Sequence, residues 1–502
     1  MKINYFLQGL IFFLILMLTL GSVMPAFSYT NQHLPSDHSN HMSIHAHLLN
    51  ETFKIFSPLS TVPVFVLQGG SFDIKLEALN INKISAYITT SYEPLVDQIW
   101  LDIIQIHTIN DTCFLTVSVP PETPEELYNI TVLIEVGNMI YSNTKPRAVK
   151  VLTKFPDSFT FAHVTDLHLG DPRGFRENIA QTIGWKSIKK CIEEINLLQP
   201  DFVIISGDLV YGQLYPYEYS REYKKCFEML QLFDVPTFLC PGNHDGYNRF
   251  REDGLDFWKT YFGPLYYSFD YGDYHFTAIN SYDAPSSLRA CMLSFPLNWG
   301  GYISDSQLQW VKNDLVIHQN RSLFVFLHHN PLWETLNNSL TGQSYLNREE
   351  LQMLVNTYGV DMVLAGHIHQ DSVDIVNDTI YLTTTTPVSE IRNKDGYWGF
   401  RMIDIKNGKI DSYNYKDPKY SIPTYHLNYS IEYSGTRAMA RIDNDLDLNI
   451  TANIKFLMPQ GEYKIDKGSI AMVRTDGNLQ QIYVTSPVQK NHELTVTLYP
   501  EP

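Results

Sequence analysis

The strongest constraint on the fold is an alternation of strand-like and helix-like segments between residues 158 and 370. Short runs rich in apolar and β-branched residues recur at 159–168, 201–208, 235–245, 322–330 and 360–369. Between them, stretches such as 177–198 repeat apolar residues at helical spacing. Strands of this composition alternate with helices in parallel sheets that are covered on both faces. The sequence therefore predicts an α/β domain.

Each apolar run ends on side chains that can bind a metal ion. In chain order these are Asp166 and His168, Asp208, Asn243 and His244, His328 and His329, and His367 and His369. Because the carboxyl ends of parallel strands meet at one edge of a sheet, we expect these side chains to lie together. Nitrogen and oxygen donors without thiolates favour Mn, Fe, Zn or Co over Ca. One such motif alone is common in ordinary turns, but all five in order indicate a metal site.

The five strand ends resemble the motifs of a known enzyme family. "DLH", "GDLVYG", "GNHD", "FLHHNP" and "GHIH" are similar to the five motifs of the calcineurin-like metallophosphoesterases, over residues 158–416. The stretch 266–281 also resembles a strand pair of the bacterial and archaeal members and the purple acid phosphatases. The resemblance implies a four-layer αββα sandwich with two divalent or trivalent transition-metal ions. It further implies an enzyme that hydrolyses phosphate mono- or diesters by attack of a metal-bridging hydroxide.

The resemblance also assigns roles to residues of this chain. It implies one metal held by Asp166, His168 and His369, a second held by Asn243, His328 and His367, and Asp208 as the bridge. His244 is expected to face the phosphate as a cation or proton donor, with Asp245 orienting it. His329 is not expected to be a ligand. Tyr211 has the spacing of a purple-phosphatase tyrosinate, but His168 would compete for that coordination position, so we interpret Tyr211 as a packing or rim residue.

Two other functions remain open at this point. An extracellular nuclease or nucleotidase of the same fold is one, and a non-catalytic cell-surface binding protein is the other. The formal charge of −17 and the absence of a basic run argue against a stable nucleic-acid partner. A catalytically inactive protein would be expected to lack a ligand, and all seven positions are filled. A small phosphoester is therefore the expected partner.

The rest of the chain predicts export and two β domains. Residues 1–28 are predicted to be a signal peptide that directs the chain out of the cytoplasm. If this segment is not cleaved, it would hold the protein near the membrane. Residues 29–53 form a His-rich linker, 54–153 an Ig-like β-sandwich and 420–502 a C-terminal β domain. Eight Asn-x-Ser/Thr sequons suit an exported chain. Five cysteines without CxxC spacing argue against a zinc ribbon and leave disulfide pairing open.

The loops between the motifs suggest the nature of the substrate. Trp299, Trp333, Tyr282 and Tyr345 could wall the site, with Arg289 as a phosphate contact. Such walls favour an ester with a sizeable organic group over inorganic polyphosphate. The alternative is that these aromatic residues pack the loops onto the core.

Overall fold

The computed structural model describes most of the chain beyond the N-terminal segment. The described residues are 53–77, 81–91, 95, 97–110, 112–171, 183–213, 218–249, 252–292, 295–296, 298–333, 345–389, 391 and 395–501. The predicted signal peptide and almost all of the His-rich linker lie outside them. Among the described residues, no helix has the length and apolar character needed to cross a membrane.

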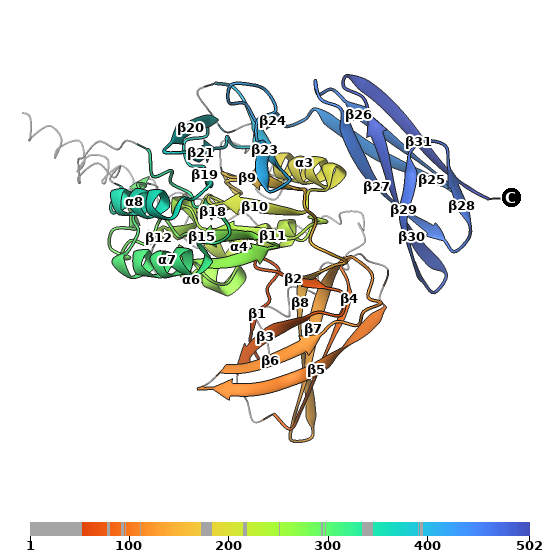
Figure 1. The fold of residues 1–502 in the computed structure, drawn as a ribbon, viewed down its shortest axis with the longest axis horizontal. Coiled ribbons are helices and arrows are strands. Elements are labelled where there is room, and N and C mark those ends of the chain that lie inside the picture. The colour runs from red at the N-terminus through yellow and green to blue at the C-terminus, as the bar shows by residue number, and fades with distance from the viewer. Residues whose placement is uncertain are drawn as a thin grey trace, which may run out of the picture. The chain divides into compact units, whose positions relative to one another are not determined.

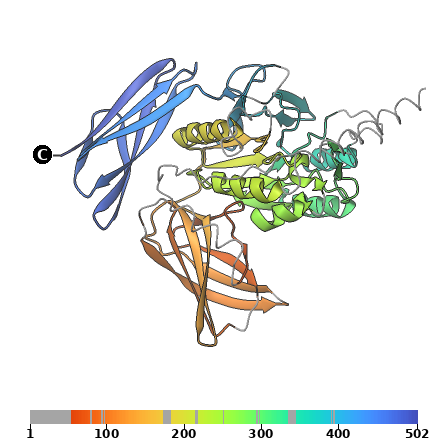
Figure 2. The ribbon, with the colours of Figure 1, turned by 180° about the vertical axis from the view of Figure 1, so that it is seen from behind.

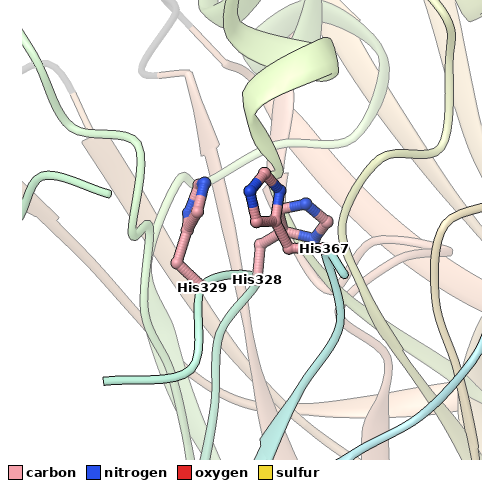
Figure 3. A group of neighbouring side chains, drawn as sticks. All are labelled: His328, His329 and His367. Carbon is pink, nitrogen blue, oxygen red and sulfur yellow. The ribbon is translucent and has the colours of Figure 1, made fainter. Parts of the chain in front are cut away.

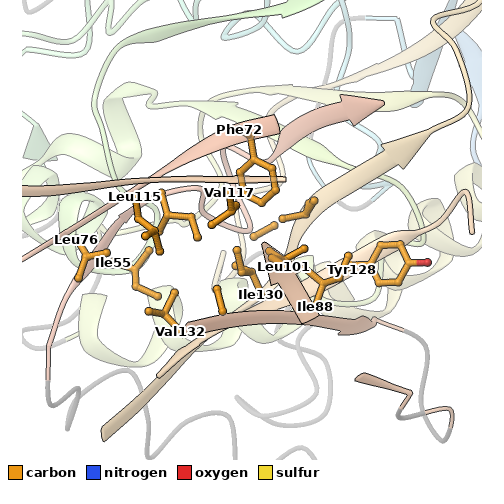
Figure 4. Close-up of a cluster of buried hydrophobic side chains, with 14 of the residues drawn as sticks. Ile55, Phe72, Leu76, Ile88, Leu101, Leu115, Val117, Tyr128, Ile130 and Val132 are labelled. Atoms are coloured by element: carbon orange, nitrogen blue, oxygen red, sulfur yellow. The ribbon is translucent and has the colours of Figure 1, made fainter. Parts of the chain in front are cut away.

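The first described region is all-β, as predicted. Its strands are β1 (Ile55–Ser57), β2 (Val64–Leu67), β3 (Ser71–Glu77), β4 (Lys83–Thr90), β5 (Gln98–Ile109), β6 (Thr112–Ser118), β7 (Leu127–Val136) and β8 (Met139–Leu152), in the order β1-β3-β6-β5-β4-β7-β8-β2. Burial alternates strictly along β3, so every second side chain faces inward. Figure 4 shows these inward side chains, among them Leu76, Leu115 and Ile130, gathered into one core.

The central domain contains two sheets. The first has the order β11-β10-β9-β22-β23, formed by β9 (Phe159–Val164), β10 (Phe202–Ser206), β11 (Thr237–Cys240), β22 (Gly399–Lys406) and β23 (Lys409–Ser412), with β24 (Ile422–Pro423) paired to β22. β9, β10 and β11 are parallel, and β22 runs antiparallel to β9. The helices α3 (Ile183–Leu198) and α4 (Tyr219–Leu230) follow β9 and β10 in the chain.

The second sheet, like the first, contains a set of neighbouring parallel strands. Its order is β14-β15-β18-β19-β21-β20, formed by β14 (Tyr267–Tyr271), β15 (Tyr274–Ala278), β18 (Ser322–Phe326), β19 (Met362–Ala365), β20 (Ser372–Val376) and β21 (Thr379–Thr383). β15, β18, β19 and β21 are parallel. Two helices, α7 (Asp305–His318) and α8 (Arg348–Tyr358), follow β15 and β18 in the chain (Figure 1).

Residues at the helix ends account for where α7 and α8 begin and end. The Ser304 hydroxyl accepts a hydrogen bond from the Gln307 amide at 3.3 Å, so Ser304 caps α7. Gly359 ends α8 in the left-handed region, as expected for a C-terminal glycine. Asn347 precedes α8 but does not cap it, because its side chain donates instead to the Ile303 carbonyl.

Apolar side chains fill the space between the two sheets. Phe161 and Phe202 of the first sheet share one core with Phe276 and Phe324 of the second. A separate core joins the other face of the second sheet to α7 and α8, through residues such as Val311 and Leu351. This packing of sheet on sheet and helix on sheet confirms the predicted α/β sandwich (Figures 1 and 2).

The remaining elements are short or lie at the C-terminal end. The short ones are α5 (Asn243–Gly246), α6 (Gly254–Tyr261), β12 (Asn248–Arg249), β13 (Glu252–Asp253), β16 (Cys291–Met292) and β17 (Phe295–Pro296). A C-terminal β region has one sheet of β25 (Leu427–Ser434), β26 (Arg437–Asn444), β31 (His492–Pro500) and β28 (Tyr463–Ile465), and another of β27 (Ile450–Pro459), β30 (Leu479–Val488) and β29 (Ser469–Asp476). All five cysteines of the chain are buried in the structure, and none of them forms a disulfide bond within the described residues.

Candidate metal centre

The candidate ligands follow the carboxyl ends of five strands. Asp166 and His168 follow β9, Asp208 follows β10, Asn243 opens α5 after β11, His328 follows β18, and His367 and His369 follow β19. These strands belong to both sheets, so the side chains come together where the two sheets face each other. The geometry that strand-end reasoning expects is therefore present.

Asp166, His168 and His369 form the first group of donors. Nε2 of His168 lies 2.9 Å from Nε2 of His369, and these nitrogens lie 3.5 Å and 3.2 Å from Oδ1 of Asp166. Donors that share one ion at bond lengths of about 2.1 Å are expected to lie roughly 3 Å apart. The three side chains are spaced as the ligands of one ion would be.

Asp208 lies between this group and a second one. Its Oδ2 is 3.6 Å from Nε2 of His168 and 3.1 Å from Nε2 of His328. The His367 ring lies next to the His328 ring, and the two ring centroids are 5.1 Å apart. One carboxylate oxygen of Asp208 is thus close to donors of both groups, which is the position a bridging ligand needs.

Several buried donor atoms in the two groups lack a hydrogen-bond partner. They are Oδ1 of Asp166, Oδ1 of Asn243 and Nε2 of His328. A buried polar atom without a partner is costly, and native proteins rarely leave one. Cations placed among the oxygen and nitrogen atoms would satisfy them. The residues present therefore fit a metal centre by their own chemistry.

Neighbouring groups orient these donors. Nδ1 of His328 is bonded to the Ser206 carbonyl at 2.8 Å, which leaves Nε2 directed toward Asp208. Nδ2 of Asn243 donates to the Tyr247 hydroxyl at 2.7 Å, so its unpartnered Oδ1 is the donor turned to the site. Partners of this kind fix the orientation of metal ligands.

His329 lies beside His328 and His367 but is not free to bind (Figure 3). Its Nδ1 is hydrogen-bonded to the Ser281 hydroxyl at 2.9 Å, and its Nε2 to the Trp299 carbonyl at 3.0 Å. Both ring nitrogens are occupied, so His329 supports the loop around the site. This agrees with the expectation that His329 is not a ligand.

Five candidate ligands have an unusual backbone conformation that sequence reasoning missed. Positive φ angles between 46° and 74° occur at Asp166, His168, Asp208, His367 and His369. Residues other than glycine rarely adopt this region, and those that do cluster at functional sites. The sequence does not predict this positive-φ conformation, because Asp and His have no conformational preference comparable to that of glycine.

Close backbone contacts allow the strand-end loops to converge. A Cβ atom on Gly242 would lie 2.2 Å from Oδ1 of Asp208, and one on Gly366 would lie 2.6 Å from Oδ2 of Asp166. The glycines in "GNHD" and "GHIH" are therefore required by the packing of the carboxylates against the neighbouring loops.

The electrostatics of the site couple carboxylates to histidines. Burial alone would raise the pKa of Asp208, but the nearby His328 and His244 outweigh it and hold that pKa well below its usual range. Burial lowers the pKa of His328, yet Asp208 outweighs this and raises it to about 9.

His244 is oriented by a partner that the sequence did not predict. Its Nδ1 is bonded to the Tyr211 carbonyl at 2.6 Å, and its Nε2 lies 4.0 Å from Oδ2 of Asp208. The prediction that Asp245 orients this ring is wrong. The Asp245 carboxylate instead accepts hydrogen bonds from the amides of Leu209, Val210 and Gly242, and so ties the loop after β10 to the loop after β11.

The predicted aromatic walls are only partly present. Tyr282 and Tyr345 are buried, and Tyr345 donates to the His329 carbonyl at 2.9 Å, so both pack the core. Trp333 is half-buried, with its ring 4.7 Å from that of His367, and it lines a pocket of about 180 Å³. Trp299 is half-buried too and contributes its carbonyl to His329.

Arg289 cannot serve as the predicted phosphate contact. Nη1 and Nη2 each lie 2.7 Å from the Asp253 carboxylate, and Nε and Nη1 also donate to the carbonyls of Ala284 and Gly246. The guanidinium is buried in these contacts. Arg289 is therefore a structural clamp between two loops.

Comparison with known proteins agrees with this geometry. Residues 159–371 match the family model of the calcineurin-like phosphoesterases. A probable glycerophosphodiester phosphodiesterase from Arcobacter nitrofigilis is 26% identical over 209 residues, which cover 41% of this chain and 71% of that protein. A 3',5'-cyclic-nucleotide phosphodiesterase from a Nostoc species is 28% identical over 219 residues, covering 42% and 72%.

One solved structure is a dimetal phosphatase from Danio rerio. It is 12% identical with a TM-score of 0.36, and the match covers 57% of this chain and 96% of that one. Residues 159–371 are thus similar to the calcineurin-like phosphoesterases, and together with the curated relatives this match shows a hydrolase of phosphoester bonds.

Proposed function

We propose that this chain, with its calcineurin-like phosphoesterase domain, hydrolyses small organic phosphodiesters at a centre of two metal ions. The observation that carries the proposal is the pair of donor groups that share Asp208 and contain unpartnered buried donor atoms. Diesters are favoured over monoesters because the relatives named above are phosphodiesterases of glycerophosphodiesters and cyclic nucleotides.

The predicted ligand sets divide the charge of the site unequally. Asp166, His168 and His369 would hold one ion, Asn243, His328 and His367 the other, with Asp208 between them. When bound, the two ions supply a water of lowered pKa and neutralise charge on the phosphoryl oxygens. Asn243 is a neutral oxygen donor, whereas Asp166 is an anion. The ion held by the second set would therefore keep more of its positive charge than the ion held by the first. A phosphodiester anion is therefore attracted to the Asn243 side.

His244 is placed to handle a proton near the substrate. The Tyr211 carbonyl can only accept, so Nδ1 of His244 carries the hydrogen and Nε2 is the nitrogen turned toward Asp208. Burial lowers the pKa of His244 to about 4, and the negative charge of a bound diester raises it. Nε2 can then donate to a phosphoryl oxygen or to the departing alkoxide.

The pocket beside His367 would receive the organic part of the ester. It is lined by Leu332, Trp333, Asn330 and Ile368 among others, so an apolar or aromatic group can lie against the indole ring. We expect higher kcat/KM on aryl and nucleoside diesters than on the matching monoesters, pyrophosphate or short polyphosphate. Replacing Trp333 by Ala should lower kcat/KM for aryl diesters by about 10-fold and leave methyl esters nearly unchanged.

A panel of these substrates with wild-type and Trp333→Ala protein checks both statements. A preference for polyphosphate would contradict the proposed substrate class. An equal loss on aryl and methyl esters would contradict the role of Trp333 and leave the substrate class standing.

We also propose that the enzyme acts outside the cytoplasm. The apolar segment near the N-terminus supports this, as do the sequons. Of the six sequon asparagines among the described residues, five are exposed, namely Asn110, Asn320, Asn377, Asn428 and Asn449, and Asn129 is half-buried. Their positions leave room for a glycan on the surface.

Mass spectrometry of the mature chain tests this location. We expect an N-terminus near Tyr29, after removal of the signal peptide. An intact Met1 on protein recovered from the cytoplasm would refute export, and it would not affect the proposed chemistry.

A further inference from the structure

One peptide group links His244 to a carboxyl group on a neighbouring helix. The carbonyl of Tyr211 accepts a hydrogen bond from Nδ1 of His244 at 2.6 Å. The amide N–H of the same peptide group belongs to Gly212, and it donates to Oε2 of Glu222 at 2.8 Å. Because a peptide group is planar, fixing its N–H also fixes the direction of its carbonyl. The position of the Glu222 carboxyl thus determines where the acceptor for His244 lies.

Glu222 is itself held in a defined orientation. It is buried in the first turn of α4 and hydrogen-bonded to the side chain of Glu218, which pairs with Arg249 at 2.8 Å. Burial, followed by the charge of Glu218, raises the pKa of Glu222 well above its usual range. A neutral carboxyl can donate its proton to Glu218 and still accept from Gly212.

The same helix turn also contacts the backbone of His244. The Tyr219 hydroxyl donates to the His244 carbonyl at 2.7 Å. Gly212 has a φ of 58°, and a Cβ atom there would lie 2.3 Å from the Tyr219 ring. The loop therefore packs on α4 so closely that only glycine fits. The first turn of α4 therefore fixes His244 in two ways. Tyr219 donates to its backbone carbonyl, and Glu222 holds the peptide group whose carbonyl accepts from its ring.

We propose that Glu222 is a positioning residue for His244 and acts through the Tyr211–Gly212 peptide group. This inference rests on the role proposed above for His244. A peptide group hydrogen-bonded at both ends is polarised, so its carbonyl becomes a stronger acceptor. Glu222 thereby keeps the hydrogen of His244 on Nδ1 and leaves Nε2 for the substrate. Within the described residues, the hydrogen bonds of the Glu222 side chain go to Gly212 and Glu218 and to no candidate metal ligand.

The first test observes His244 directly, without metal or substrate. In ¹⁵N-labelled, metal-free full chain, the Nδ1–H signal of His244 is identified by its loss in His244→Ala. We expect Glu222→Gln to keep this signal, because the amide oxygen of glutamine can accept from Gly212 and its NH₂ group can donate to Glu218. We expect Glu222→Leu to shift or lose it. An unchanged signal in Glu222→Leu would overturn the proposal.

The second test separates positioning from general support of the fold. Glu222→Leu should lower kcat about 10- to 100-fold with little change in KM and metal content, and Glu222→Gln should stay within about twofold. In the His244→Ala background, Glu222→Leu should cause no further loss. The matched control is Glu228→Gln, a half-buried carboxylate on the same helix that pairs with Lys225 at 3.0 Å.

The outcomes are distinguishable. A further loss of kcat in the double variant, or a Glu222→Gln protein as impaired as Glu222→Leu, contradicts the positioning role. Circular dichroism of each variant shows whether it is folded. If Glu222→Leu does not fold, the comparison of Glu222→Gln with the wild-type protein takes its place as the test. If the wild-type protein hydrolyses no phosphodiester, the proposed function fails, whereas the resonance test still decides whether Glu222 orients His244.

Discussion

Asp208→Asn is expected to lower phosphodiesterase activity and metal content together, each by more than about 100-fold. Changes to groups that merely orient metal ligands reduce metal affinity or activity by about 10- to 100-fold, and Asp208 is predicted to contact both ions directly. Oδ2 of Asp208 lies within 3.6 Å of donors from both groups, so losing its charge affects both. Elemental analysis and diester hydrolysis of the same preparation measure the two effects.

The matched control for this variant is Asp256→Asn. Asp256 is exposed and pairs with Lys259 at 3.0 Å on α6, so the same change of charge there should leave metal content and activity unchanged. An Asp208→Asn protein that loses activity but binds metal normally would show that Asp208 is not the bridging ligand.

His244→Ala is expected to retain its metal and to lose kcat by about 10²- to 10⁴-fold. Its Nδ1 donates to the Tyr211 carbonyl and its Nε2 lies 4.0 Å from Oδ2 of Asp208, so the ring is held at the edge of the site with Nε2 available for a proton. Metal content should match that of the wild-type protein, because His244 is outside both predicted ligand sets.

His492→Ala is a suitable control for this variant, since His492 is exposed in the C-terminal β region. Loss of metal in His244→Ala would indicate that His244 is a ligand. A wild-type rate would remove it from the mechanism.

The strand ends were the most predictable part of the molecule. Apolar runs that stop at Asp, Asn or His indicate both a parallel sheet and the edge at which its side chains gather, because strand direction and chain order are linked in such folds. Asp208 and His328 are 120 residues apart in sequence, yet they lie 3.1 Å apart for this reason. The spacing of apolar residues predicted an α/β domain and the β regions, whereas the sandwich arrangement of the α/β domain was predicted from the resemblance to the family.

Side-chain environment was much harder to predict. Tyr282, Tyr345 and Arg289 stand in the loops expected over the site, but all three are buried. An aromatic or Arg residue in a loop has the same sequence signature whether it faces the substrate or the core. Charge pairing with Asp253, which settles the place of Arg289, depends on a tertiary contact that no local pattern shows.

Hydrogen bonds from side chains to backbone groups could not be predicted from the sequence. The partner of His244 is the carbonyl of Tyr211, and every residue has a carbonyl. Asp245 stood next to His244 and was the natural choice of partner, but its carboxylate meets three backbone amides instead. Adjacent residues on a tight turn point in different directions, so proximity in sequence misled the assignment.

The account depends most on the claim that two metal ions at this site are required for hydrolysis of phosphodiesters. The direct measurement is diesterase activity against metal content as a chelator removes the ions from the wild-type protein and added metal restores them. The proposal predicts about two ions per chain in the active protein, loss of activity as they leave, and recovery when they return. Full activity in metal-free protein would contradict it.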